Sequence, residues 1–365
     1  MYDDRVTNVY ETEGMTDAEK WNYYNNKRRE YNSLMPIKLN KFDVIDFMQA
    51  VEAPPIKTGF DNLDNALDGG LREGLYVLGA VPSLGKTTFA LQMADQIAQQ
   101  GYDVLIYSLE MTRIRLTARS ISRLTYELDP ENAKALNSVI GDKSNYSEQD
   151  RKLLQKATDT YNVFGRNLYI SDIMMHINLF RSEGRRGTRA KVSDIVNDVN
   201  NHIWTTGRRP IVFIDYLQYI APEFEGMNEK QKIDNSVEEL KVLGLVQKIP
   251  VIAISSFNRA AYNGTADMTS FKESGDIEYS ADVLFGFQLQ GMNELPNLKN
   301  DEERKQRIKE LRDVDVRKVE LLLLKNREGG RDATLLYDYT PKYNHFRATE
   351  VSEDYAAQNA PKRIR

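Results

Sequence analysis

Residues 79–87 read GAVPSLGKT and resemble the pattern G-x-x-x-x-G-K-[ST] of a phosphate-binding loop, with five residues instead of four between the two glycines. The apolar run 75–78 before them predicts a buried strand, and residues 88–94 predict an amphipathic helix. A loop in that place directs backbone N–H groups and the positive end of the helix dipole at an anion, while glycines let the backbone close around it. The sequence thus predicts a nucleoside triphosphate site with the binding residues Gly79, Pro82, Ser83, Gly85, Lys86, Thr87 and Thr88.

Two side chains of this loop have expected chemical roles. Lys86 should reach the β- and γ-phosphates, and the Thr87 hydroxyl should bind Mg²⁺. The alternative is a glycine turn that ends in Lys-Thr by chance.

Two carboxylates are expected at strand ends near the loop. Asp215 closes the apolar run 211–214, the Walker B arrangement, and could hold Mg²⁺; it could also be an ordinary capping aspartate. Glu110 follows the apolar run 104–108 and would reach the same carboxyl edge of the sheet, where ligands collect. There it could polarise a water that attacks the γ-phosphate, or it could be a helix N-cap or first-turn acid.

Lys325 and Arg327 are two apart in a strand-like run, so they should share one face. Facing the nucleotide of an adjacent subunit, both cations would stabilise the transition-state charge in trans. The alternative is a solvated charge pair on an edge strand.

The elements that position these residues alternate strand-like runs with helical patterns from residue 56 to about residue 287. This predicts an α/β fold with a mainly parallel sheet flanked by helices. The expected strands are 75–78, 104–108, 211–214, 251–254 and 283–287, followed by an antiparallel hairpin of 319–325 and 334–339. Residues 129–161 are polar and should be helical.

Composition narrows the class of protein. The 365 residues include no cysteine, which excludes disulfides, thiolate metal sites and cysteine nucleophiles. No run approaches the ~18 apolar residues of a membrane span, so we expect no membrane partner and a cytoplasmic protein. A net charge of −5 gives no global sign of nucleic-acid binding. The separate histidines His176, His202 and His345 have no metal-ligand spacing.

Three regions are expected along the chain. Residues 1–55 should form a helical extension, with a capping box at Thr16 and Glu19, that docks on a neighbouring subunit. Residues 56–349 should form the ATPase domain, and 350–365 a disordered tail. The basic loop 181–191 is either a second contact to nucleic acid or a solvated face.

These segments together resemble the C-terminal ATPase domain of DnaB-type replicative helicases, a RecA-like motor family. The resemblance covers most of residues 56–347 and rests on the segments 57–64, 79–88, 107–111, 214–218, 250–259, 272–278, 281–283 and 325–327. It implies a homo-oligomer, a ring hexamer, that hydrolyses ATP or another NTP with Mg²⁺ at subunit interfaces. It also implies 5′-to-3′ movement on single-stranded DNA, with a primase or helicase loader as further partners.

The resemblance also implies residue roles. Lys86 and Thr87 would bind phosphates and Mg²⁺, Asp215 the metal, and Glu110 would be the base. Lys325 and Arg327 would be the trans-acting finger. A segment containing Lys272, Glu273 and Gly275 would contact the DNA backbone, unless it is an ordinary polar turn.

The chain departs from the family in two respects. Ser256 stands where the family has a glutamine that senses the γ-phosphate, and Asn258 or Arg259 could take its place. Residues 1–50 are too few for the family's N-terminal collar domain, which suggests a phage or mobile-element version. These departures favour the alternative function, a DNA-binding ATPase without productive unwinding that works as a loader, recombination mediator or regulatory switch. A degenerate structural subunit is disfavoured because the phosphate- and metal-contacting residue types are all present.

Overall fold

The computed structural model describes Thr16 and residues 53–172, 189–258, 261–262, 264–271, 275–298, 300–327, 329 and 333–349. Contacts divide the chain into two units, Met1–Ala53 and Pro54–Arg365, and all that follows concerns the second. Several predictions lie outside the described residues: the extension other than Thr16 and residues 53–55, the basic loop up to residue 188, His176, Arg259, Lys272, Glu273 and the tail 350–365.

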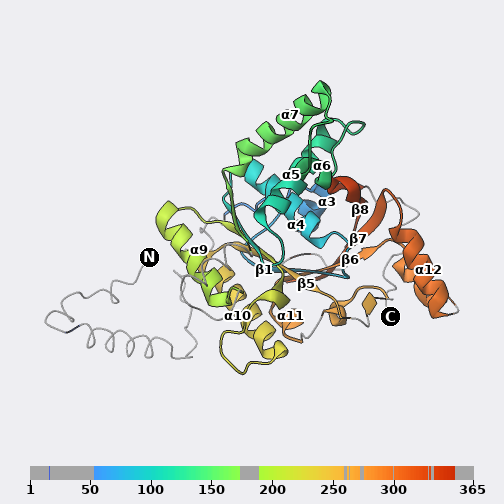
Figure 1. Cartoon of the computed structure of the whole chain (residues 1–365). Helices are drawn as coiled ribbons and strands as arrows, with labels where there is room; N and C mark the ends of the chain where they lie inside the picture. Colours follow the sequence, from blue (N-terminus) through green and yellow to red (C-terminus); the bar gives the residue numbers. More distant parts are fainter. Residues whose placement is uncertain are drawn as a thin grey trace. The chain divides into compact units, whose positions relative to one another are not determined.

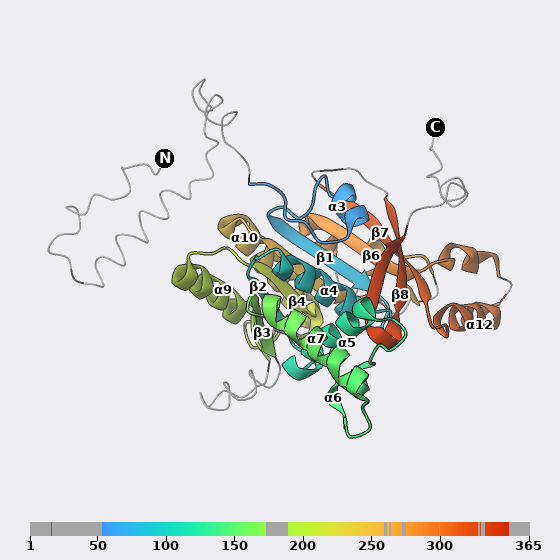
Figure 2. The ribbon, with the colours of Figure 1, turned by 90° about the horizontal axis from the view of Figure 1, so that it is seen from above.

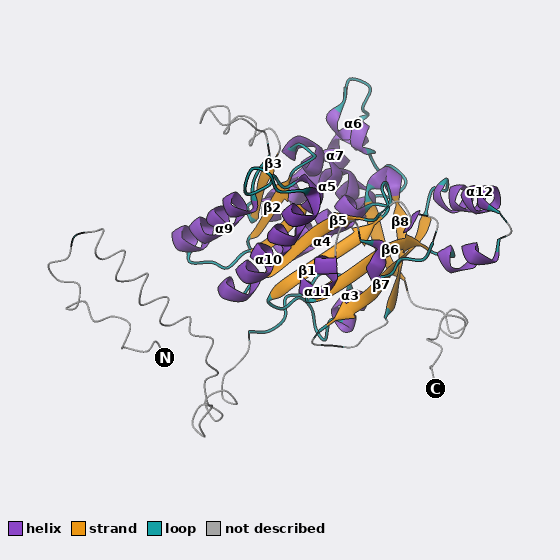
Figure 3. Cartoon of the chain, turned by 90° about the horizontal axis from the view of Figure 1, so that it is seen from below, coloured by secondary structure: helices purple, strands orange, loops and turns teal. Residues whose placement is uncertain are grey.

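One mixed sheet organises the second unit (Figure 3). Within the described ranges its nine strands have the order β3-β2-β4-β5-β1-β6-β7-β8-β9. Pairing is parallel from β3 to β6 and antiparallel from β6 to β9. The strands are β1 (Gly74–Ala80), β2 (Val104–Ser108), β3 (Leu168–Asp172), β4 (Ile211–Asp215), β5 (Pro250–Ser256), β6 (Val283–Leu289), β7 (Arg317–Asn326), β8 (Thr334–Thr340) and β9 (His345–Thr349).

Helices cover both faces of this sheet (Figure 1). Alternate residues of β1 divide between two apolar clusters, with Tyr76 and Leu78 in one and Leu75 and Val77 in the other. The first cluster packs under α4, whose neighbours are α5 and α7, and the second under α9 and α10 (Figure 2). The α-helices are α3 (Asp61–Ala66), α4 (Lys86–Gln99), α5 (Arg113–Leu128), α6 (Leu136–Ile140), α7 (Glu148–Gly165), α9 (Val192–Thr206), α10 (Glu229–Gln247), α11 (Gly275–Ser280) and α12 (Asp301–Arg312).

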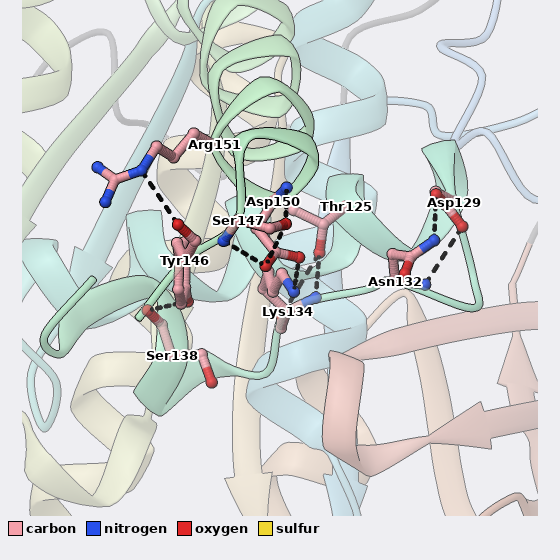
Figure 4. Close-up of polar contacts among 9 residues, drawn as sticks. All are labelled: Thr125, Asp129, Asn132, Lys134, Ser138, Tyr146, Ser147, Asp150 and Arg151. Carbon is pink, nitrogen blue, oxygen red and sulfur yellow. Dashed lines mark hydrogen bonds and ion pairs between the residues drawn. The ribbon is translucent and has the colours of Figure 1, made fainter. Parts of the chain in front are cut away.

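The polar region after α5 is ordered by its own side chains (Figure 4). Asp129 accepts hydrogen bonds from the backbone and side chain of Asn132. Ser147 and Asp150 form a capping box that begins α7, and Lys134 pairs with the same Asp150. The predicted helical segment is therefore two helices, α6 and α7, tied back to the end of α5.

The expected fold class is confirmed: a parallel sheet between helices, completed by antiparallel C-terminal strands. All five predicted parallel strands exist; β2 has the expected bounds, and β1, β4, β5 and β6 are longer than expected. No sequence signal marked β3 and β9, because most of their side chains are only partly buried or exposed and they show no apolar run. In the described part of the chain, no helix has the length and apolar character to cross a membrane.

Candidate nucleotide-binding site

The phosphate-binding loop joins β1 to α4, which begins at Lys86. Ser83 and Gly85 have φ values of 65° and 98°, a left-handed conformation that turns successive N–H groups toward one side of the loop. Gly85 is also required by space, because a Cβ would lie 2.9 Å from ring carbons of Tyr339 and Phe346. Local strain and packing therefore shape the loop as an anion-binding turn at a helix N-terminus.

Gly79 has a different environment from the rest of the loop. It lies inside β1, and a Cβ there would lie 2.4 Å from carbons of the Phe257 and Phe271 rings. These two rings pack edge to face, with centroids 5.2 Å apart. The close approach that this glycine permits is thus to an aromatic pair.

Lys86 occupies the mouth of the loop. Its Nζ donates to the carbonyl oxygen of Ala80 at 2.8 Å. Burial lowers the pKa of the amine to about 8, although the negative charges of Asp215 and Glu110 act to raise it. A phosphate beside this amine would favour its charged form, so anion binding should raise the pKa of Lys86 and increase the protonated fraction of its amine.

Thr87 and Asp215 meet as the sequence predicts. The Thr87 hydroxyl donates to Asp215 Oδ2 at 2.7 Å, linking α4 to the end of β4. Burial raises the pKa of Asp215, and the hydrogen bond from Thr87 opposes that rise. A hydroxyl and a carboxylate are hard oxygen donors of the kind Mg²⁺ prefers, and Mg²⁺ is usually held by one or two such side chains plus substrate phosphates. The Thr87–Asp215 pair therefore fits a magnesium ion shared with a nucleotide. Among the described residues there is no group of three or more His, Cys, Asp or Glu that could hold a metal.

Glu110 lies between β2 and α5, where it is exposed to solvent. The N-cap of α5 is Thr112, so Glu110 precedes the cap position and does not occupy it. The adjacent Leu109 N–H donates to the carbonyl oxygen of Asp215 at 2.8 Å, which fixes the strand ends together. The charge of Glu110 acts on both Lys86 and Asp215, so this carboxylate lies near the loop.

Arg119 is a residue of this site that the sequence reasoning missed. It projects from α5, and its Nη1 donates to the Thr88 hydroxyl at 3.1 Å. Burial lowers the pKa of Arg119, while the charges of Asp215 and Glu110 raise it. Its Nε is buried without a hydrogen-bond partner in the described chain. The available signal was spacing, because Arg119 follows the buried Leu116 on the inward face of the helix.

Arg317 is a second missed cation, at the apex of the loop. Its Nη1 donates to the Ser83 carbonyl oxygen at 3.1 Å. The guanidinium also lies 5.9 Å from the ring centroid of Tyr339. Nothing in the local sequence pattern distinguishes this arginine, since the place of β7 in the sheet, between β6 and β8, brings it to the loop.

The end of β5 holds the candidate sensors. Ser256 pairs in register with Ala80 of β1, and its N–H donates to Gln218 Oε1 at 3.3 Å. Gln218 Nε2 donates to Ser255 Oγ at 2.9 Å, so one amide joins the ends of β4 and β5. Asn258 uses its own amide locally, donating to Thr269 O at 2.8 Å and accepting from Ala261 N at 3.0 Å.

Lys325 and Arg327 lie at the end of β7 that is far from the phosphate-binding loop of the same chain. The register pairs Asn326 with Val283, and Val283 with Tyr76 near the start of β1. β7 lies between β6 and β8, so it is not an edge strand. Gly275, expected to contact DNA, is the first residue of α11.

Comparisons with known proteins agree with this geometry. The model of the DnaB-like helicase C-terminal domain matches residues 55–348. "Replicative DNA helicase DnaB" of Pasteurella multocida is 31% identical over 238 residues, which are 63% of this chain and 45% of that protein. The protein of the same name from Geobacillus stearothermophilus is 28% identical over 270 residues, 70% of this chain and 52% of the relative. The chain thus spans about half the length of the curated relatives it matches.

Solved structures support the fold. One of them, described as an "ATPase Domain", superposes with a TM-score of 0.65 at 21% identity, covering 84% of this chain and 96% of that one. A second structure, titled "The Structure Of A DnaB-Like Replicative Helicase And Its Interactions With Primase", gives a TM-score of 0.65 at 20% identity, covering 86% of this chain and 67% of the other. The resemblance inferred from the sequence motifs is confirmed, and the chain belongs to the DnaB-like helicase C-terminal domain family.

Proposed function

We propose that this chain is the motor of a replicative DNA helicase, hydrolysing ATP to move along single-stranded DNA. The observation that carries the proposal is the hydrogen bond of 2.7 Å between Thr87 and Asp215, beside Lys86 and Glu110. It joins the phosphate-binding loop to a buried carboxylate at the edge of the sheet, the arrangement expected of an NTP-hydrolysing site. The family assignment supports the DNA-directed part of the proposal.

The reaction assigned to this site is attack of water on the γ-phosphorus. Glu110 accepts the proton of the attacking water, the bond to the leaving oxygen of ADP breaks, and inorganic phosphate forms. Lys86 neutralises charge on the β- and γ-phosphates, and the loop N–H groups orient them. Thr87 and Asp215 would hold Mg²⁺, which would supply neutralisation of the negative charge on the β- and γ-phosphates.

Assembly completes the proposed site. Because Lys325 and Arg327 lie at the end of β7 that is far from Lys86, we assign them to the nucleotide of a neighbouring subunit. A ring hexamer moving 5′ to 3′ on single-stranded DNA is the assembly we propose, with Gly275 and the preceding Lys272 and Glu273 contacting the DNA backbone. A primase or helicase loader is the further partner we propose, on the strength of the family.

The alternative function is a DNA-stimulated ATPase that does not unwind, acting as a loader, recombination mediator or switch. One observation favours it: Ser256, the family's glutamine position, carries a side chain too short to reach a phosphate. Asn258 has its amide committed to Thr269 and Ala261, so it would have to break both contacts to act as the sensor.

Purified protein distinguishes these functions. ATP hydrolysis with and without single-stranded DNA, together with strand displacement on a forked duplex, should both be positive for the helicase. Hydrolysis without displacement would favour the alternative. Glu110→Gln should bind nucleotide normally yet lose turnover, whereas the control Glu148→Gln, an exposed residue of α7, should match wild type. Near-normal turnover in Glu110→Gln would contradict the assignment of the base.

A further inference from the structure

Asp282 lies between α11 and β6, tied by both its backbone and its side chain to the start of β1. Its N–H donates to Leu75 O at 2.8 Å, and its Oδ2 accepts the Leu75 N–H at 2.9 Å. A Cβ on Gly74 would lie 2.7 Å from the same Oδ2, so the glycine leaves room for the carboxylate. One carboxylate oxygen is thereby fixed on the sheet, which leaves Oδ1 directed at other groups.

The second oxygen faces the proposed trans finger. Arg327 Nη1 lies 3.2 Å from Asp282 Oδ1, and the Arg327 backbone N–H donates to Asp282 O at 3.1 Å. Nη2 of the same guanidinium donates to the carbonyl oxygen of Tyr279 near the end of α11. Lys325 Nζ contacts the same segment, 2.6 Å from Glu278 O. Both cations are therefore held by the same segment, from the end of α11 to the start of β6, and Asp282 is the residue of that segment whose charged side chain makes the contact.

The Arg327 guanidinium can still bind another molecule while Asp282 and Tyr279 hold it. The Arg327 side chain is 42% exposed, against 19% for Asp282. The contacts above engage its two terminal nitrogens, and a guanidinium carries five N–H donors in a fixed fork. Donors therefore remain for a phosphate on another molecule.

We infer that Asp282 is a positioning residue for hydrolysis in the neighbouring subunit: it holds Arg327 in the orientation from which its remaining donors meet the phosphate. The inference rests on the proposed function. A long side chain that must be ordered during each turnover loses rate, and a misplacement of about 1 Å can cost about 10²-fold. Asp282 removes that ordering step by fixing both the backbone and the head group of Arg327.

The first test is Asp282→Asn in the full chain. The amide oxygen can still accept from Leu75 N–H, but the charge that orients Arg327 is gone. We expect kcat for ATP to fall about 10- to 100-fold, with KM within about twofold because the neighbour's loop binds the nucleotide. The control is Lys241→Met, which removes a cation 3.9 Å from the same oxygen and should change kcat less than about twofold. A kcat for Asp282→Asn within about twofold of wild type would overturn the inference.

Mixing experiments show which subunit needs Asp282. If Asp282→Asn impairs the arginine that a subunit offers to its neighbour, mixing it with Lys86→Ala protein should restore activity, because that protein has an intact Asp282 and Arg327. Mixing it with Arg327→Ala protein should not restore activity. Relief by Arg327→Ala alone would mean that Asp282 acts on its own loop through Leu75 and β1, which overturns the inference but leaves the proposed function standing. If co-assembled Lys86→Ala and Arg327→Ala proteins do not restore each other, the shared interface site fails, and the inference fails with it.

Arg327→Lys gives an independent test that leaves Asp282 and its tether to β1 unchanged. A lysine keeps the charge but lacks the planar fork that reaches Asp282 and Tyr279 together. Its kcat should fall at least as far as that of Asp282→Asn, because lysine also lacks the guanidinium donors that meet the phosphate. Adding Asp282→Asn to it should cost less than about threefold more, because the contact with Asp282 is already lost. A further loss equal to the full effect of Asp282→Asn would refute the positioning role.

Discussion

Gln218→Met tests whether one amide secures the sheet edge next to the loop. Methionine nearly preserves the volume of glutamine, so the change removes the hydrogen bonds to Ser255 Oγ and from Ser256 N–H with little cavity cost. Each bond contributes about 1 kcal/mol net, and a buried group left unsatisfied costs about 1–3 kcal/mol. Ser255 is fully buried, whereas Ser256 is half-buried and its bond of 3.3 Å is long. We therefore expect a loss of about 2 kcal/mol in the free energy of unfolding.

Equilibrium urea unfolding, followed by circular dichroism and by tryptophan fluorescence, measures this loss. The matched control is Gln247→Met, whose amide donates to Asn200 Oδ1 at 2.9 Å in an exposed position between α10 and α9. Water can replace that bond, so the control should change stability by less than about 0.5 kcal/mol. If Gln218→Met is no more destabilising than Gln247→Met, with both transitions two-state, the amide does not secure the ends of β4 and β5.

Three further outcomes are expected. Ser256→Gln should raise the stimulation of ATP hydrolysis by single-stranded DNA, because the glutamine amide nitrogen lies two bonds farther along the side chain than the serine oxygen. An unchanged ratio of rates with and without DNA would contradict this expectation. Gly79→Ala should lower the free energy of unfolding by about 1–3 kcal/mol in urea titrations, since its Cβ would meet the Phe257 and Phe271 rings at 2.4 Å, and a neutral result would show that the rings move freely. ATP binding at pH 9 should take up protons, because Lys86, with a pKa of about 8, is mostly neutral there until phosphates recharge it. Calorimetry in buffers of different ionisation enthalpy measures that uptake, which should be small at pH 7 and absent in Lys86→Met.

The parts of the site that follow one another along the chain were predictable from sequence. The loop, its strand and its helix form a continuous segment, so the positions of Lys86 and Thr87 relative to each other are set locally. Asp215 was placed correctly beside Thr87 because Asp215 ends β4 and the loop before Thr87 follows the end of β1, and the carboxyl ends of parallel strands share one edge of the sheet.

The parts that depend on long-range pairing were not predictable. Arg317 reaches Ser83 only because β6 separates β7 from β1 and β7 runs antiparallel to both, and no periodicity in residues 293–318 indicates this. Gln218 was part of a recognised motif, but its contact with Ser255 required the neighbouring positions of β4 and β5. At Gly79 the loop pattern does not reveal that two phenylalanine rings from later in the chain lie where a Cβ would be.

The antiparallel direction of β7 has a consequence for the number of complete ATP sites in an assembly. Arg317 is the first residue of β7 and touches the loop of its own subunit, whereas Arg327 follows the last residue. One strand of about 30 Å therefore separates a subunit's own nucleotide loop from the arginine that it offers to a neighbour. If Arg327 serves a neighbour, contacts between subunits are head to tail, and such contacts either close or run on without limit. A closed assembly has as many complete sites as subunits. An open one of the same size has one fewer, with an unserved loop at one end and an idle arginine at the other, so the fraction of subunits that turn over ATP reports closure directly.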